Sequence, residues 1–342
     1  MVDVLWSPRF WFGETNLSWE DFEGVNNDSY DLLYPMPVSI LILLTRGMFV
    51  NFVFEKLGLK QRVDKKSFAN GKLENVYREG KGAPKDLTIK KAVESGMSER
   101  QAERWLRKRT ESDKPTKKEK LVETTMRASY YLSTCIYGML ILYSKDWLWD
   151  TRYCWYQYPR HHIEDEVRRY YMIQLTFYWF LTFSQLYGDS TKKRKDFWQM
   201  MLHHAASISL IYFSWVLNMV RAGMLVLVLH DMADVLLELA KMCKYANWQK
   251  MCNLTFAIFV VTWIVTRLYI YPKYVVYTTV YESAEILFPT NFVPPVYYVM
   301  NTFMILLLVL HVIWTYYIIK ALIKALNSTG NIEKDERSSS SE

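Results

Sequence analysis

Long apolar segments separated by short, strongly charged ones are the feature that most constrains this chain. A helix that crosses about 30 Å of hydrocarbon needs about 20 apolar residues, because only an internally hydrogen-bonded backbone is stable away from water. Seven segments meet or approach this requirement, so the sequence predicts an all-α membrane protein with about seven transmembrane helices and excludes a single soluble globule. They cover approximately 36–57, 128–143 (short, and expected to be extended by its flanks), 170–187, 197–219, 222–240, 253–271 and 296–319.

The orientation in the membrane follows from the distribution of Lys and Arg, which concentrate in cytosolic loops. Segment 59–127 holds 20 Lys and Arg against 11 Asp and Glu, and its net charge of +9 exceeds the +7 of the whole chain. It is therefore expected in the cytosol. With seven spans, the N-terminus is then lumenal, the C-terminus is cytosolic, and the basic run Lys192, Lys193, Arg194 and Lys195 lies on the cytosolic side.

This topology divides the chain into five predicted regions. They are a lumenal tail (1–35), a first membrane anchor (36–58), the basic cytosolic segment (59–127), a six-helix domain (128–320) and an acidic, Ser-rich cytosolic tail (321–342). Asn16 and Asn27 begin glycosylation sequons in the lumenal tail, where they could be used. The sequons at Asn253 and Asn327 are expected at the membrane face or in the cytosol, where they could not.

The basic segment contains one short amphipathic helix. Ser98 is its expected N-cap, and Gln101 closes a capping box. Ala102, Trp105 and Leu106 form an apolar stripe beside a basic face, an arrangement that resembles the third helix of a homeodomain. Homeodomains place an adenine-reading Asn late in this helix, whereas Lys108 stands at the corresponding position here. No nucleic-acid partner is therefore expected, and the segment is interpreted as a truncated homeodomain-like element.

Ionisable side chains inside the membrane are costly, so each marks a candidate functional site. Asp231, Asp234 and Glu238 are spaced i, i+3 and i+7, which puts three carboxylates on one face of the fifth span. His230 borders this face. Two interpretations are open: the acids line a polar cavity, or they pair with Lys241 or Arg221 to hold helices together. We favour the cavity.

The fourth span carries the adjacent pair His203 and His204, with Ser207 one turn beyond His203. A His pair opposite an acidic stripe suits general-base or nucleophilic chemistry, because a carboxylate fixes the imidazole tautomer and stabilises its charged form. The predicted catalytic residues are His203, His204, His230, Asp231 and Asp234. Ser207, Glu238 and the basic run 192–195 are the predicted substrate-binding residues.

Metal chemistry is the main rival interpretation of these side chains. Membrane di-iron hydroxylases need eight or more histidines in clusters such as H-x-x-H-H, and this chain has six histidines and no H-x-x-H. A single zinc ion held by His203, His230 and Asp231 is the alternative that remains. We expect no metal and no permanently bound cofactor.

The stretch from Lys193-Arg-Lys-Asp-Phe-Trp-Gln-Met-Met-Leu-His-His through Leu229-His-Asp-Met-Ala-Asp-Val-Leu-Leu-Glu resembles the signature of the longevity-assurance-type ceramide synthases. The predicted lumenal tail, the homeodomain-like segment and the six C-terminal spans are similar to the same family and to the wider TLC membrane family. The resemblance implies a TLC-type bundle of six helices in the endoplasmic reticulum membrane. It also implies transfer of an acyl group from acyl-CoA, as co-substrate, to the amine of a sphingoid base.

Two mechanisms fit that implied reaction. In the first, which we favour, the thioester acylates His203 or His204 and the amine attacks the acyl-imidazole. In the second, a histidine with Asp231 or Asp234 deprotonates the amine for direct attack. The basic run 192–195 would attract the polyanionic CoA, and membrane lipid is a further expected partner. A homo- or heterodimer, and a non-catalytic lipid-sensing or lipid-transporting TLC protein, stay open as alternatives.

The remaining polar residues of the spans carry weaker expectations. Arg46, Arg267 and His311 are expected to make polar contacts inside the bundle. The lumenal segment 273–295 resembles the loop region that tunes acyl-chain length in the ceramide synthases. The serines of the C-terminal tail are candidate phosphorylation sites.

Overall fold

The computed structural model describes residues 29–56, 98–113, 117–187, 196–288 and 293–327, with a few isolated residues between 74 and 96. This described part of the chain is helical and contains no strand. The long helices are α3 (Pro35–Lys56), α7 (Lys117–Tyr143), α9 (Asp165–Tyr187), α10 (Phe197–Val216), α11 (Val220–Tyr245), α12 (Gln249–Trp263) and α14 (Pro295–Asn327).

Each of the seven expected spans overlaps one of these helices. The two helical stretches Gln249–Leu287 and Pro295–Asn327 combine the length and the apolar composition that a membrane crossing requires. The other five helices have 20 to 27 residues, which is sufficient for about 30 Å at 1.5 Å per residue. The short expected span 128–143 is lengthened at its N-terminal side, because α7 begins at Lys117.

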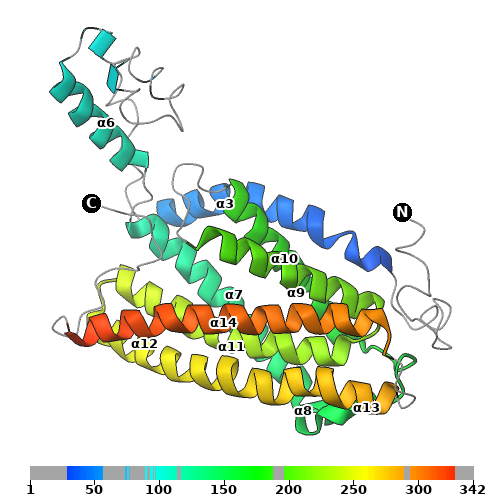
Figure 1. Cartoon of the computed structure of the whole chain (residues 1–342). Coiled ribbons are helices and arrows are strands. Elements are labelled where there is room, and N and C mark those ends of the chain that lie inside the picture. Colours follow the sequence, from blue (N-terminus) through cyan, green and yellow to red (C-terminus); the bar gives the residue numbers. More distant parts are fainter. Residues whose placement is uncertain are drawn as a thin grey trace.

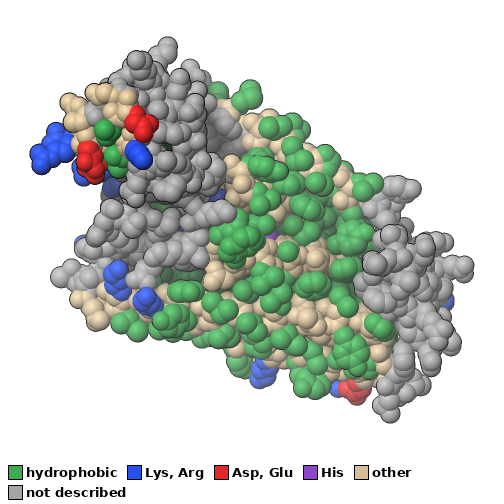
Figure 2. All heavy atoms as spheres, turned by 45° about the horizontal axis from the view of Figure 1, so that its top comes forward, with side chains coloured by type: hydrophobic (Ala, Val, Ile, Leu, Met, Phe, Trp, Pro, Cys, Tyr) green, Lys and Arg blue, Asp and Glu red, His purple; other side chains and the backbone are tan. Residues whose placement is uncertain are grey.

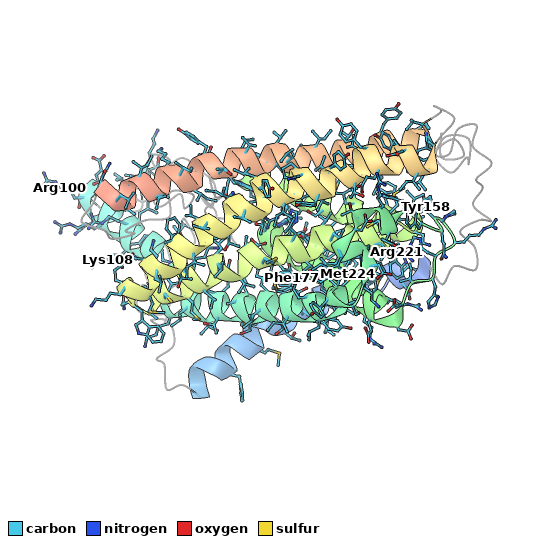
Figure 3. The ribbon with its side chains drawn as sticks, turned by 90° about the horizontal axis from the view of Figure 1, so that it is seen from below. Arg100, Lys108, Tyr158, Phe177, Arg221 and Met224 are labelled. Carbon is cyan, nitrogen blue, oxygen red and sulfur yellow. The ribbon has the colours of Figure 1, made fainter. Side chains whose placement is uncertain are left out.

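The helices form a bundle around α11, which contacts α7, α9, α10 and α12 (Figure 1). Helix α3 packs on the outside against α9, and α14 packs against α10. The start of α3 and the end of α14 lie at opposite ends of the bundle. We call the end with Ser144–Glu164 and the start of α14 the Trp155 end, and the end with the turn between α11 and α12 the Trp248 end. In Figure 3 Tyr158 and Arg221 mark the Trp155 end, while Phe177 and Met224 lie between the two ends.

The outer surface of the bundle is apolar. Leu44, Val261, Ile305 and Tyr316 are between 49% and 71% exposed, and hydrophobic side chains cover most of the described bundle surface on the face seen in Figure 2. Large exposed apolar areas are unusual in soluble monomers. Exposed aromatic residues, which favour membrane interfaces, occur at the Trp155 end (Trp149, Tyr153 and Tyr281) and at the Trp248 end (Trp248).

Two tight turns reverse the chain around α11, and both use an asparagine in the left-handed conformation. Asn218 has φ 52° and Asn247 has φ 61°. After α10, the amide of Met219 donates to the Ser214 carbonyl (2.7 Å) and the amide of Asn218 to the Trp215 carbonyl (3.2 Å). This is the Schellman pattern, which satisfies the free carbonyls of a helix end. The same pattern ends α11 at Asn247.

Helix α12 continues without a break through two π-helical stretches, η5 (Ile264–Val276) and η6 (Thr278–Glu282), and ends as α13 (Ser283–Leu287). The part of the expected loop segment from Lys273 to Leu287 is therefore helical. Wide π-helical turns often occur at functional sites. Here they carry Arg267 and Tyr271, both buried, into the core of the bundle.

The expected amphipathic helix of the basic segment is also present, as α6 (Glu99–Asp113). The amide of Ser98 donates to the Gln101 side chain (3.3 Å), as in a capping box. Ala102 is buried, and Trp105 packs edge-on against Tyr77 with ring centroids 6.0 Å apart. The helix projects with its labelled residues Arg100 and Lys108 at the end of the molecule opposite Tyr158 (Figure 3).

Candidate active site

Helices α10, α11 and α14 bring three histidines together in the core of the bundle. The ring of His203 on α10 stacks near that of His230 on α11, with centroids 6.4 Å apart and planes 19° apart. His204, the neighbour of His203 on α10 and not one of these three, is buried, with its ring centroid 5.9 Å from that of His203. His311 on α14 is the third member, with its ring centroid 5.0 Å from that of His230. His203 of the fourth expected span thus contacts His230, which borders the acidic face of the fifth, and His311 extends this contact.

A hydrogen bond between ring nitrogens joins His230 and His311. Their Nε2 atoms are 3.1 Å apart, and Nδ1 of His230 is 2.6 Å from the carbonyl of Val226. That carbonyl is an acceptor only, so Nδ1 of His230 carries the proton and its Nε2 accepts. His311 must then donate from Nε2. The backbone carbonyl of Val226 therefore fixes the His230 tautomer.

Arg267 reaches this cluster from η5. Its guanidinium is buried and donates to the backbone carbonyl of His230 (2.7 Å), and it lies 3.5 Å from Nε2 of His311. A carboxylate oxygen of Asp234 is 3.8 Å from the same guanidinium. A buried arginine in lipid-facing proteins needs such partners, because an isolated charge there is costly. Arg267 thus links α11 to η5 at the level of the histidines.

The three carboxylates of the acidic stripe have different partners. Asp231 is buried and accepts hydrogen bonds from the Gln174 amide (2.5 Å) and the Tyr170 hydroxyl (3.3 Å) of α9. Glu238 forms an ion pair with Lys241 one turn along α11 (2.7 Å). The alternative interpretation, pairing with Lys241, therefore describes Glu238, whereas Asp231 and Asp234 connect α11 to different neighbouring helices.

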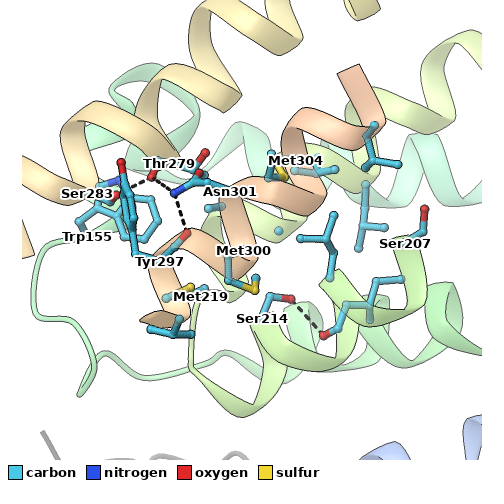
Figure 4. Close-up of a pocket in the computed structure, with 18 of the residues that line it drawn as sticks. Trp155, Ser207, Ser214, Met219, Thr279, Ser283, Tyr297, Met300, Asn301 and Met304 are labelled. Atoms are coloured by element: carbon cyan, nitrogen blue, oxygen red, sulfur yellow. Dashed lines mark hydrogen bonds between the residues drawn. The ribbon is translucent and has the colours of Figure 1, made fainter. Parts of the chain in front are cut away.

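An apolar cavity extends from the histidine cluster toward the Trp155 end. Its volume is about 950 Å³, opening included, and His230, Tyr178 and Ser207 lie at its inner end. Met300 and Met304 of α14 face Met219 and Ser214 across it (Figure 4). Trp155, Phe288, Pro294, Val296 and Tyr297 line the far end.

Gly223 allows the close helix approach that shapes one wall of this cavity. A Cβ atom there would lie 1.8 Å from the Tyr171 hydroxyl. This hydroxyl donates to the Val220 carbonyl (3.0 Å), and it is 3.3 Å from the hydroxyl of Ser214. Only glycine lets the Tyr171 ring reach these partners.

His203 lies one turn beyond the inner end of the cavity. It precedes Ser207 by one turn on α10, on the side of the Trp248 end. Its ring centroid is 6.3 Å from that of Tyr178 and 5.2 Å from that of Trp314. A group attached to His203 could therefore place a long apolar tail in the cavity while its head stays near the Trp248 end.

Several predicted residues lie outside the described part of the chain. They are the basic run Lys192, Lys193, Arg194 and Lys195, the sequon residues Asn16 and Asn27, the tail from 328 onward, and the side chain of Arg46. The zinc alternative joins His203, His230 and Asp231. Among the residues that can be described, no group of three His, Cys, Asp or Glu side chains is placed to hold a metal ion.

Sequence reasoning assigned Arg267 and His311 only general polar contacts, yet both touch the His230 side of the site. Each was visible as a lone ionisable residue in an apolar span. A single polar residue carries no spacing pattern, so no helical register could place it opposite His230. Gln174 and Tyr170, the partners of Asp231, carry no charge and were not singled out.

The chain is similar in sequence to a known family of membrane proteins. The family model of the TLC domain matches residues 120–320. The chain is 40% identical to ceramide synthase 5 of Mus musculus over 98% of its own length and 81% of that protein. It is 38% identical to ceramide synthase 5 of Homo sapiens (98% and 86%) and 35% identical to ceramide synthase 3 of Mus musculus (93% and 83%).

Proposed function

Because the chain belongs to the ceramide synthase family of TLC-domain membrane proteins, we propose that it transfers a fatty acyl group from acyl-CoA to the amine of a sphingoid base. The product is a ceramide or dihydroceramide. The observation that carries the proposal is the position of His203, beside His230 and one turn from the inner end of an apolar cavity.

The favoured mechanism passes through an acyl-histidine. A neutral ring nitrogen of His203 attacks the thioester carbon and releases CoA, and the amine then attacks the acyl-imidazole. His230 and His311 share one proton between their Nε2 atoms, and Nδ1 of His311, which has no partner among the described residues, is the candidate to accept the amine proton. His204 supports the ring of His203, while Asp231 and Asp234 hold α11 in place through Gln174 and Arg267. Ser207 lines the route of the acyl tail.

The length of the cavity favours a long acyl chain. From Leu307 to Val296, both in its wall, α14 advances about 16 Å at 1.5 Å per residue, and the turn back to His203 adds about 5 Å. An extended chain advances about 1.2 Å per bond, a third of the rise of an extended residue. Roughly 18 bonds therefore fit between His203 and the Trp155 end.

The remaining parts of the proposal concern the membrane. We propose seven spans in the endoplasmic reticulum membrane, with the Trp155 end lumenal and the Trp248 end cytosolic. The basic run 192–195 precedes α10, so it would lie at the cytosolic mouth and attract the phosphates of CoA. Sphingoid base and acyl chain, both lipids, would enter from the bilayer.

The test uses membranes that contain the full chain. Acyl-CoA alone is supplied first, and protein mass spectrometry searches for an acyl adduct on His203; a panel of acyl-CoA lengths with sphingoid base then follows. We expect an adduct that disappears in His203→Ala, together with ceramide formation that is lost in His203→Ala and in Asp231→Ala. His162→Ala is the control, since His162 is exposed.

Ceramide without any adduct would favour direct transfer, and wild-type activity in both variants would remove the site assignment. No ceramide from the wild type would favour the non-catalytic lipid-binding alternative.

A further inference from the structure

Trp314 carries a buried hydrogen-bond donor that has no acceptor within the described part of the chain. Its side chain is 7% exposed, and its Nε1 atom is enclosed. An indole N–H can only donate, and buried tryptophans usually find a partner for it. The neighbouring Trp263 does so, because its Nε1 donates to the Thr315 hydroxyl (2.9 Å). Trp155 likewise donates to Thr278 (2.8 Å).

Trp314 lies beside His203, the proposed acyl acceptor. Its ring lies 5.2 Å from that of His203, centroid to centroid, and the planes are nearly perpendicular at 79°. Trp314 follows His311 by one helical turn on α14, so it lies on the same side of the cavity's inner end as His203. An acyl group bonded to a His203 nitrogen would therefore lie beside Trp314, with its tail in the cavity.

We propose that Trp314 is a catalytic residue whose indole N–H donates to the carbonyl oxygen of the reacting acyl group. This inference rests on the proposed function. Negative charge develops on this oxygen in the transition state of acyl transfer, and donors fixed in advance in a dry site stabilise that charge strongly. Because the indole N–H of Trp314 has no partner before the reaction, it can bind this oxygen without first breaking another hydrogen bond.

Acyl transfer through His203 takes place in two steps. A lone pair of His203 attacks the thioester carbon, the carbonyl electron pair moves onto the oxygen, and collapse of this oxyanion expels the CoA thiolate and leaves an acyl-imidazolium. The amine then attacks the same carbon, the oxyanion forms again, and collapse returns neutral imidazole and the amide. The proton that the attacking nitrogen loses neutralises the thiolate, so the products are ceramide and CoA thiol. Trp314 holds the oxyanion in both steps.

The experiment compares two neighbouring tryptophans, Trp314 on α14 and Trp263 on α12, whose ring centroids are 6.4 Å apart. Trp314→Phe removes the N–H and keeps an aromatic ring, while Trp263→Phe, the matched control, removes an N–H that already has the Thr315 partner. CoA release from acyl-CoA alone is followed with a thiol reagent, and ceramide formation is measured with sphingoid base present. Loss of one oxyanion donor lowers kcat about 10²- to 10³-fold. For Trp314→Phe we expect such a loss in the rate constant of CoA release, which is a single turnover without the amine, and in kcat for ceramide formation, with KM little changed. Trp263→Phe should change both rates by only a few-fold.

A loss in kcat below about tenfold in Trp314→Phe, or an equal loss in Trp263→Phe, would overturn the proposal. Where Trp314→Phe has a lowered melting temperature, replacement of Trp314 by benzothienylalanine decides, because sulfur takes the place of the N–H in a ring of the same shape. The result for the wild-type protein distinguishes a failure of the proposed function from a failure of the role of Trp314. If it releases no CoA and makes no ceramide, the proposed function fails; if it is active and the benzothienyl variant equals it, only the role of Trp314 fails.

Discussion

At the residue scale, His161 shows how burial controls a side chain outside the membrane-spanning helices. It lies in the segment before α9, is 1% exposed, and has no hydrogen-bond partner on either ring nitrogen among the described residues. Burial, together with the positive charge of Arg221, lowers the pKa of His161 to about 3. The folded protein therefore keeps this ring neutral, whereas the unfolded chain protonates it below about pH 6.5.

This difference predicts a loss of stability in mild acid. A histidine whose folded pKa is depressed destabilises the fold as the pH falls below its unfolded pKa, because only the unfolded state takes up the proton. Between pH 6.5 and pH 5 the loss is about 2 kcal/mol, at about 1.4 kcal/mol per pH unit. His161→Phe should remove this part of the pH dependence, as measured by melting temperatures in detergent across that range. His162→Phe is the control, and parallel pH curves for wild type and His161→Phe would contradict the expectation.

Single residues were predictable from the sequence where a spacing pattern placed them. Adjacent histidines at 203 and 204, and acids spaced i, i+3 and i+7 from Asp231, each indicate a polar helix face. His203 and His230, which lie on these two helices, are in contact. The Arg267–Asp234 contact and the His230–His311 hydrogen bond join residues 33 or more positions apart in the sequence. No helical periodicity relates such pairs, because the rotation of one helix against another depends on packing.

At the element scale, the turn at Asn218 joins a helix end to the segment before α9. Asn218 is fully buried, and its amide donates to the carbonyls of Pro159 and His161. Asn247 adopts the same backbone conformation in an exposed turn. The two turns therefore separate the cost of a left-handed backbone from the cost of lost side-chain hydrogen bonds.

We expect Asn247→Ala to destabilise the protein by about 1 kcal/mol, because alanine tolerates the left-handed region less well than asparagine, whose side chain can form local hydrogen bonds there. Asn218→Gly keeps that backbone conformation but leaves two buried carbonyls without their donor, at about 1–3 kcal/mol for each unsatisfied group. Asn218→Ala should add both costs and be the least stable. Thermal unfolding in detergent measures the order, and an Asn218→Gly variant as stable as the wild type would show that the two hydrogen bonds contribute nothing.

Helices were more predictable than their ends. The apolar segment 253–271 predicts a membrane span, and the helix that contains it continues for about 16 residues beyond it, to Leu287. Pro272 and Lys273 follow directly after this segment. The wide π-helical turns accommodate the proline, and Lys273 lies at the surface with its ammonium 3.0 Å from the Tyr269 hydroxyl.

At the scale of the whole molecule, the bundle has its two described chain ends on opposite sides. The start of α3 belongs to the Trp155 end and the end of α14 to the Trp248 end (Figure 1). An odd number of crossings has this consequence, and the basic composition of segment 59–127 then favours a cytosolic Trp248 end. The same orientation puts the His203 side of the cavity toward the cytosol, where acyl-CoA is expected to enter.

Glycan mapping tests this orientation. Glycosylation of Asn-X-Ser/Thr takes place on lumenal segments, so Asn16 and Asn27 should carry glycans, and Asn253, in α12 near the Trp248 end, and Asn327, at the end of α14, should not. Replacing both Asn16 and Asn27 by Gln should abolish the gel shift on deglycosylation, whereas the Asn253→Gln, Asn327→Gln pair should leave it unchanged. A shift that persists without Asn16 and Asn27 would place one of the other sequons in the lumen. The basic run 192–195 would then face the side without acyl-CoA, and the proposed route of the substrate to His203 would have to be abandoned.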